Sequence, residues 1–98
     1  MKISIAMTTY NGEAYIEKQI RSLLHQTRVP DEIIICDDGS SDATIDILQR
    51  ILAEEGGSFC RVIKNEKNLG YRKNFKKSIG LTTGDLIFLS DQDDIWEK

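Results

Sequence analysis

The sequence EIIIC at residues 32–36 contains three consecutive isoleucines, and its last four residues form an unbroken apolar run. Because such a run has no polar face, the strand it predicts must be buried on both sides, as strands are in a parallel sheet. Parallel strands need crossover connections, which are usually helices. The sequence supplies them, since strand and helix patterns alternate along the chain. Strands are predicted at residues 2–8, 32–36, 59–64 and 86–90, and helices at residues 13–26, 42–55 and 71–81.

This β-α-β-α-β-α-β order predicts a single α/β domain with three layers, α/β/α, around a parallel sheet. We expect a doubly wound, Rossmann-like sheet with the strand order 3-2-1-4, in which the winding reverses between the first and fourth strands. Ser40 or Ser41 is expected to cap the second helix, because serine is a favoured N-cap residue. Phe75 and Ile79 are expected to face the sheet from the third helix.

Composition excludes several classes of function. The 98 residues include 13 Lys and Arg against 16 Asp and Glu, a net charge of −3, which disfavours nucleic acids and anionic membranes as general partners. The longest apolar runs have four residues, far below the roughly 20 that span a bilayer. No signal-peptide pattern is present, and Cys36 and Cys60 lie in predicted buried strands, so we expect reduced thiols and a cytoplasmic location.

Acidic and other polar residues follow the predicted strands. In an open parallel sheet, ligands bind beyond the carboxyl ends of the strands, near the point where the winding reverses. Residues 37–42 (DDGSSD) and 91–94 (DQDD) bring six aspartates to that edge from two distant segments. Like charges crowded together need a neutralising partner, and oxygen ligands without His or Cys suit Mg²⁺ or Mn²⁺. The residues therefore predict a metal-phosphate site.

Other phosphate-binding designs do not match. The sequence contains no G-x-x-x-x-G-K-[ST] motif and no G-x-G-x-x-G motif after the first strand. That strand ends in Thr8 and Thr9 rather than Asp, which disfavours schemes with a nucleophilic aspartate at that position. No serine lies in a nucleophile elbow. P-loop NTPases and dinucleotide-binding enzymes are thus disfavoured.

Four motifs then occur in a fixed order. They are residues 3–12 (ISIAMTTYNG), residues 37–42 (DDGSSD), the Asn68-Leu69-Gly70 turn with Asn74, and residues 89–94 (LSDQDD). Together they resemble the family 2 glycosyltransferases with the GT-A fold, and the resemblance covers essentially the whole chain. The DQDDIW variant at residues 91–96 looks most like bacterial transferases that build capsular, O-antigen or rhamnose-containing polysaccharides.

The resemblance implies a role for individual residues. Thr8 and Tyr10 would line the nucleotide pocket, with Tyr10 near the base. Asp38, supported by Asp37, would accept the imide N–H of the base, which favours uracil or thymine. The remaining implied positions are Lys73 at the base or diphosphate, Asp91 at the ribose or donor sugar, and Asp93 as the direct ligand of Mn²⁺ or Mg²⁺.

The resemblance also implies the reaction, an inverting transfer of a sugar from a UDP- or dTDP-sugar to a glycan or lipid-linked acceptor in cell-surface polysaccharide synthesis. Complete members of the family are much longer, and the catalytic base lies in the part that follows these motifs. We therefore expect residues 1–98 to be an N-terminal donor-binding part without the acceptor half, inactive alone, from a parent that can lie at the inner face of the membrane. The Leu86–Ser90 strand would then have an open edge through which the chain self-associates.

Two other functions stay open from the residues. The same site could serve a non-catalytic module that binds a nucleotide and a metal. It could also serve a Mg²⁺-dependent sugar nucleotidyltransferase, although such enzymes typically carry a glycine-rich basic loop after the first strand. Residues 9–12 (TYNG) do not supply that loop.

Overall fold

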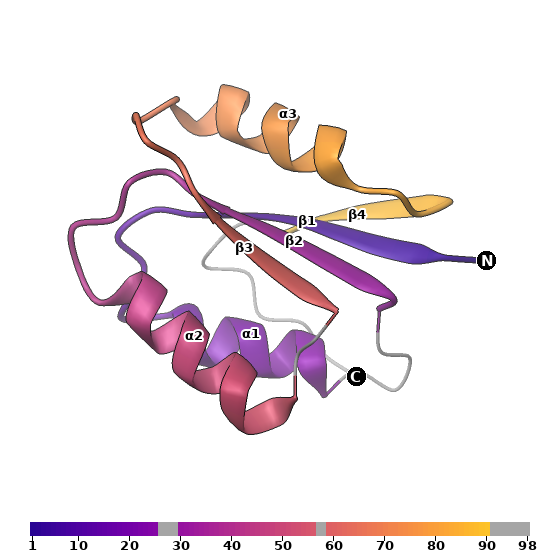
Figure 1. The fold of residues 1–98 in the computed structure, drawn as a ribbon, viewed down its shortest axis with the longest axis horizontal. Helices are drawn as coiled ribbons and strands as arrows, with labels where there is room; N and C mark the ends of the chain where they lie inside the picture. Colours follow the sequence, from indigo (N-terminus) through magenta and orange to yellow (C-terminus); the bar gives the residue numbers. More distant parts are fainter. Residues whose placement is uncertain (26–29, 57–58, 91–98) are drawn as a thin grey trace.

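The computed structural model describes residues 1–25, 30–56 and 59–90. Four parallel strands form one sheet in the order β3-β2-β1-β4, which confirms the predicted topology (Figure 1). The elements along the chain are β1 (Ile3–Thr9), α1 (Ile16–Leu24), β2 (Glu32–Asp37), α2 (Thr44–Glu55), β3 (Cys60–Lys64), α3 (Tyr71–Leu81) and β4 (Leu86–Ser90). None of the helices in the described ranges is long and apolar enough to cross a membrane.

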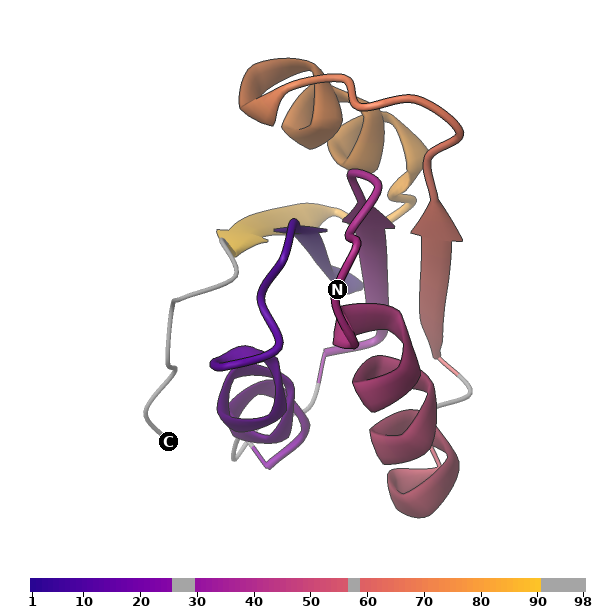
Figure 2. The ribbon, with the colours of Figure 1, turned by 90° about the vertical axis from the view of Figure 1, so that its left-hand side faces the viewer.

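The sheet is covered on both faces, as expected for a three-layer fold. Helices α1 and α2 lie side by side on one face, and α3 lies on the other (Figures 1 and 2). The main apolar core fills the space between the sheet and the α1–α2 pair. Its buried members are Ile5, Met7, Ile16, Ile20, Leu23, Leu24, Ile33, Ile35, Leu48 and Ile51. Within β2, the residues Ile33 to Cys36 are all fully buried, because alternate side chains point into each of the two layers.

The face covered by α3 is built differently from the prediction. Ile79 is 36% exposed and Phe75 is only half-buried, so the expectation that they face the sheet is wrong for Ile79. The buried residues of α3 are instead Asn74 and Ser78. The Asn74 side chain donates to the backbone oxygen of Cys36 at 2.8 Å, and this bond offsets the cost of burying an amide.

Two helix starts also differ from the sequence predictions. Helix α2 begins at Thr44, and neither Ser40 nor Ser41 caps it. The Ser40 hydroxyl donates to Asp37 and accepts the Asn11 N–H, while the Asp42 carboxylate accepts the Thr44 N–H at 3.0 Å. Helix α1 begins at Ile16 rather than at residue 13, because a turn closed by hydrogen bonds to the Gly12 oxygen precedes it.

Strand β4 forms an edge of the described sheet, next to β1. Its four apolar residues, Leu86 to Leu89, are each at least 40% exposed, whereas Ser90 is buried. Cysteines 36 and 60 are free thiols, as expected, although Cys60 is half-buried rather than buried. Burial raises the pKa of the Cys36 thiol and raises the pKa of Cys60 to about 12.

Candidate functional site

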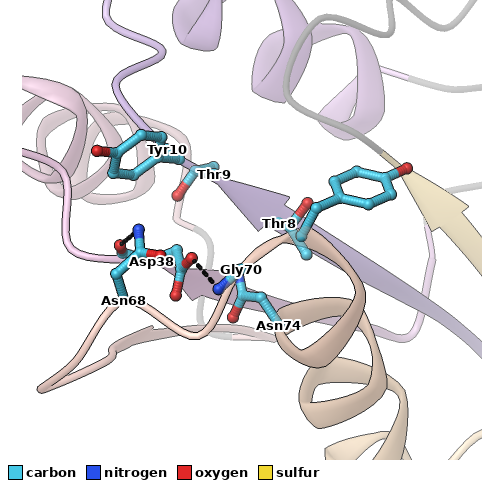
Figure 3. A pocket seen from close by; sticks show the side chains of 8 residues that line it. Thr8, Thr9, Tyr10, Asp38, Asn68, Gly70 and Asn74 are labelled. Carbon is cyan, nitrogen blue, oxygen red and sulfur yellow. Dashed lines mark hydrogen bonds between the residues drawn. The ribbon is translucent and has the colours of Figure 1, made fainter.

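A pocket of about 370 Å³ lies at the carboxyl ends of β1 and β2, beside the first turn of α3 (Figure 3). This is the edge of the sheet at which ligands are expected to bind in such folds. The residues that line the pocket are Thr8, Thr9, Tyr10, Asp38, Asn68, Gly70, Tyr71 and Asn74. The structure therefore brings together the segments that follow β1, β2 and β3 in the sequence.

Asp38 is the acidic residue of this pocket. It directly follows β2, and its backbone N–H donates to the Thr9 oxygen at 2.9 Å. Its carboxylate accepts the backbone N–H groups of Leu69 at 2.7 Å and Gly70 at 3.0 Å, and the side chain of Asn65 at 3.0 Å. Only 4% of Asp38 is exposed. The negative charge is thus held in place by neutral N–H donors.

The loop between β3 and α3 wraps around Asp38 because of its turn residues. Gly70 has a φ of +84°, a conformation that a side chain disfavours, and it is the residue before the first turn of α3. The Asn68 side chain donates to the backbone oxygen of Asp38 at 3.1 Å (Figure 3). The Asn68-Leu69-Gly70 turn singled out in the sequence therefore builds one wall of the pocket.

Sequence reasoning missed the polar network behind Asp38. The buried Asn65 side chain donates to the carboxylate of Asp38 and, at 2.7 Å, to the side-chain oxygen of Asn74. The Lys77 ammonium donates to the Asn65 side-chain oxygen at 2.7 Å. Asn74 belonged to a recognised motif, but Asn65 carried no signal, because it begins a loop in which most residues are polar.

Asp37 and Asp42 lie outside the pocket lining. Asp37 is fully buried and accepts the Thr9 hydroxyl at 2.7 Å and the backbone N–H groups of Gly39 and Ser40. Burial alone raises the pKa of Asp42, but hydrogen bonds from Thr44 outweigh it and hold that pKa below its ordinary value. Hydrogen bonds from uncharged groups therefore stabilise the carboxylates of Asp37, Asp38 and Asp42 at this edge of the sheet.

The other predicted site residues are placed as follows. Thr8 is almost fully buried at the end of β1, and Tyr10 is about half exposed at the mouth of the pocket. Lys73 is exposed on α3, one residue before Asn74, and is not among the residues that line the pocket. Asp91 and Asp93 lie outside the described residues. Within the described part of the chain, no three His, Cys, Asp or Glu residues are grouped so as to hold a metal ion.

Comparison with known sequences identifies relatives over the whole length of the chain. The family model for glycosyl transferase family 2 matches residues 4–98. The dTDP-rhamnosyl transferase RfbG of Shigella flexneri is 39% identical over 95 residues, which cover 94% of this chain and 33% of RfbG. The putative teichuronic acid biosynthesis glycosyltransferase TuaG of Bacillus subtilis is 34% identical over 96 residues, which cover 98% of this chain and 37% of TuaG. The chain thus spans about a third of the length of these relatives.

Solved structures agree with this result. S. aureus TarS in complex with UDP superposes with a TM-score of 0.84 and 29% identity, covering 97% of this chain and 28% of TarS. The mannosyltransferase PcManGT from Pyrobaculum calidifontis, solved with GDP-Man and Mn²⁺, gives a TM-score of 0.89 at 19% identity, over 99% of this chain and 29% of PcManGT. This second likeness concerns the fold alone. With the strand order, the pocket and the family match in agreement, the chain belongs to glycosyl transferase family 2 and has the GT-A fold.

Proposed function

We propose that this chain is the nucleotide-sugar-binding part of a glycosyltransferase that uses a UDP- or dTDP-sugar. The observation that carries the proposal is Asp38, a buried carboxylate fixed at the back of the pocket by three N–H donors. An ionised carboxylate has about four acceptor positions, so one is left for a ligand. The imide N–H of uracil or thymine is a donor of the right kind for that position, and adenine has no such group.

The neighbouring residues would then orient the nucleotide. Thr8 and Tyr10 line the pocket beside Asp38, and the half-exposed ring of Tyr10 offers a face on which a base can stack. Asp37 would act indirectly, because it fastens the start of the loop that follows Asp38. Lys73 would reach the base or diphosphate from the first turns of α3 as a point charge rather than a bidentate fork.

The remaining assignments extend the same proposal to the complete enzyme. Asp93 would bind Mn²⁺ or Mg²⁺, and Asp91 would contact the ribose or the donor sugar. When bound, the metal would offset the negative charge that develops on the departing nucleoside diphosphate. PcManGT, which shares the fold, is solved in complex with GDP-Man and Mn²⁺, so the fold can hold a divalent cation beside a nucleotide sugar.

We further propose an acceptor that is a glycan or a lipid-linked sugar, in the synthesis of a cell-surface polysaccharide on the cytoplasmic side. The name of TuaG, a putative teichuronic acid biosynthesis glycosyltransferase, supports a polysaccharide product, and the name of RfbG, a dTDP-rhamnosyl transferase, supports a dTDP-sugar donor. Asp38 is the sole acid among the residues that line the described pocket, and its remaining acceptor position is assigned to the base of the donor. We therefore expect the 98-residue chain to bind the donor without transferring its sugar.

A thermal-shift titration tests the donor assignment directly. The full chain would be melted with UDP, dTDP, GDP or ADP, each with and without Mn²⁺. At a ligand concentration of about 100 times Kd the native state gains about 2.7 kcal/mol. Each kcal/mol raises the Tm of a domain this size by about 4–8 °C. UDP or dTDP should raise the Tm clearly, with a larger rise in the presence of Mn²⁺.

Two Asp→Asn substitutions distinguish a specific loss of metal binding from the general effect of removing one negative charge. Asp93→Asn should remove the part of the shift that depends on Mn²⁺, whereas Asp46→Asn, at an exposed position of α2, should leave it unchanged. Equal shifts with ADP and UDP would contradict the role given to Asp38. Absence of any shift with UDP and dTDP, confirmed by calorimetry, would overturn the proposed donor.

A further inference from the structure

Just over half of the basic residues of this acidic chain are concentrated in one segment. Residues 61–77 contain seven of the 13 Lys and Arg residues but only one acidic residue, Glu66. The remainder of the chain is therefore strongly acidic. We call the seven residues the basic face, and all of them are exposed. The basic face consists of Arg61, Lys64, Lys67, Arg72, Lys73, Lys76 and Lys77.

The structure gathers these residues around α3. Among the helices in the described ranges, α3 is the one that covers this face of the sheet, opposite α1 and α2 (Figures 1 and 2). Its buried side is formed by Asn74 and Ser78, so the helical period of 3.6 residues directs Arg72 and Lys76 away from the sheet. The other cations come from α3 itself, from the edge strand β3 and from the loop between them. The net charge of −3 therefore says little about the field on this side of the molecule.

The two helical layers differ in whether their arginine and lysine side chains form ion pairs. On the α1–α2 layer, Arg21 forms ion pairs with Glu17, Glu54 and Glu55, and Arg50 pairs with Glu17. Within the described residues, no cation of the basic face forms an ion pair with an acidic side chain. Cations that have no acidic partner among the described residues leave a positive potential that an external anion can neutralise.

Two further features indicate the kind of anion. A second pocket of about 410 Å³ is lined by Lys64, Lys67 and Lys77, together with Asn65, Glu66 and Leu69, and is large enough for a phosphate headgroup. At the first turn of α3, the Tyr71 ring is 62% exposed and packs edge-to-face on Phe75, with ring centroids 5.1 Å apart. Tyrosine is the type of side chain that is enriched at membrane–water interfaces.

We propose that the basic face docks on the surface of an anionic lipid bilayer, with the second pocket receiving a phospholipid headgroup. Clusters of four to eight Lys and Arg residues on a helix are typical of such surfaces. Binding of single-stranded nucleic acid would call for a series of stacking aromatics, and Tyr71 is the exposed aromatic of α3. This surface goes beyond the donor-binding role and does not depend on it.

Docking through the basic face would bring the bilayer close to the donor pocket. Gly70, Tyr71 and Asn74 of the α3 N-terminal region line the donor pocket, so a bilayer in contact with α3 would lie beside the mouth of that pocket. A lipid-linked acceptor could then be presented from the bilayer at short range. Contact with the membrane would thus be made by this domain itself, and not only by other parts of a longer protein.

Vesicle flotation with the full chain tests the proposal. The chain should float with vesicles of phosphatidylcholine and phosphatidylglycerol, and should not float with phosphatidylcholine alone. Raising the salt from about 0.1 M to about 1 M shortens the Debye length from about 10 Å to about 3 Å and should abolish binding. The double substitution Arg72→Gln with Lys76→Gln should weaken binding about 30-fold, because each basic residue near such a surface contributes about 1 kcal/mol.

The matched control is Lys18→Gln with Arg50→Gln, which removes the same charge from the α1–α2 layer. Circular dichroism and melting curves would verify that both double variants are folded. An equal loss of vesicle binding in the two variants would overturn the proposal, as would failure of the unmodified chain to float. Tighter binding to duplex DNA or single-stranded RNA at the same salt would also overturn it, in favour of a nucleic-acid surface. Nucleotide-induced Tm shifts are measured separately, so the two proposals can fail independently.

Discussion

At the scale of single residues, Asp37 and Asp38 are adjacent in the sequence but have different surroundings. Asp37 ends β2 and bonds to Thr9 and to the loop before α2, whereas Asp38 bonds to the loop before α3. Successive residues of a strand point to opposite faces of the sheet, which explains the divergence. The resemblance assigned the base contact to Asp38 with Asp37 in support, and the structure has Asp38 in the lining of the pocket and Asp37 outside it.

Asn65 is expected to stabilise the site from behind. Asn65→Ala removes the donor to Asp38 and leaves the buried side-chain oxygen of Asn74 without that partner, which should cost about 1–3 kcal/mol. The Tm should fall by about 4–8 °C per kcal/mol, and the affinity for UDP should fall with it. The matched control is another amide, Gln49→Ala, at an exposed position of α2, which should cost less than about 0.5 kcal/mol. Equal losses in the two variants would contradict this role.

The two thiols are expected to be unreactive in the folded chain. Burial raises the pKa of Cys60 to about 12 and raises that of Cys36, so the folded state disfavours the reactive thiolate. For Cys60 the thiolate fraction near pH 8 should be about a thousandfold lower than for an ordinary thiol. Alkylation by iodoacetamide, followed by mass spectrometry, should be slow in the native chain, faster as pH rises, and rapid in denaturant. Rapid native labelling at pH 8 would show that these thiols are not shielded.

At the scale of elements, the sequence predicted the helices and strands that carry apolar patterns. For α3 it predicted the first and last residues but not the side that is buried. Helix α1 buries Ile16, Ile20 and Leu23, as its helical spacing indicates. Helix α3 buries Asn74 and Ser78 instead of an apolar stripe, because it lies over a backbone oxygen and the polar network of the site. A hydrophobic pattern cannot reveal an interface that is formed by polar side chains.

Two glycines near the end of α3 should respond in opposite directions to alanine. At Gly84 an added Cβ would lie 2.3 Å from the Ser4 side-chain oxygen and 2.9 Å from the Ser4 nitrogen, so Gly84→Ala should cost about 1–3 kcal/mol. At Gly80, within α3, nothing lies within 4 Å, and Gly80→Ala should stabilise the chain by about 0.5–1 kcal/mol. Thermal melts of both variants measure the difference. A neutral Gly84→Ala would show that β1 and the α3–β4 connection are not in close contact.

At the scale of the whole molecule, the exposed apolar surface of β4 is expected to drive self-association. Leu86 to Leu89 are each at least 40% exposed on a strand at the edge of the described sheet, and such edges pair with other chains. Sedimentation velocity should show a mass that increases with protein concentration. Leu89→Lys should suppress this increase, whereas Tyr15→Lys, at an exposed hydrophobic residue outside β4, should not. A monomer mass that is independent of concentration would rule out the association.

The sequence predicted the α/β class, the strand order and the edge of the sheet at which the pocket forms. It could do so because the pattern of the elements and the right-handedness of crossovers leave few ways to pack a buried parallel strand such as β2. The family resemblance assigned Asp38 to the base, but the fixed position of its carboxylate and the support that it receives from Asn65 appear only in the folded chain. These features depend on contacts between segments about 30 residues apart, and no local periodicity encodes such contacts.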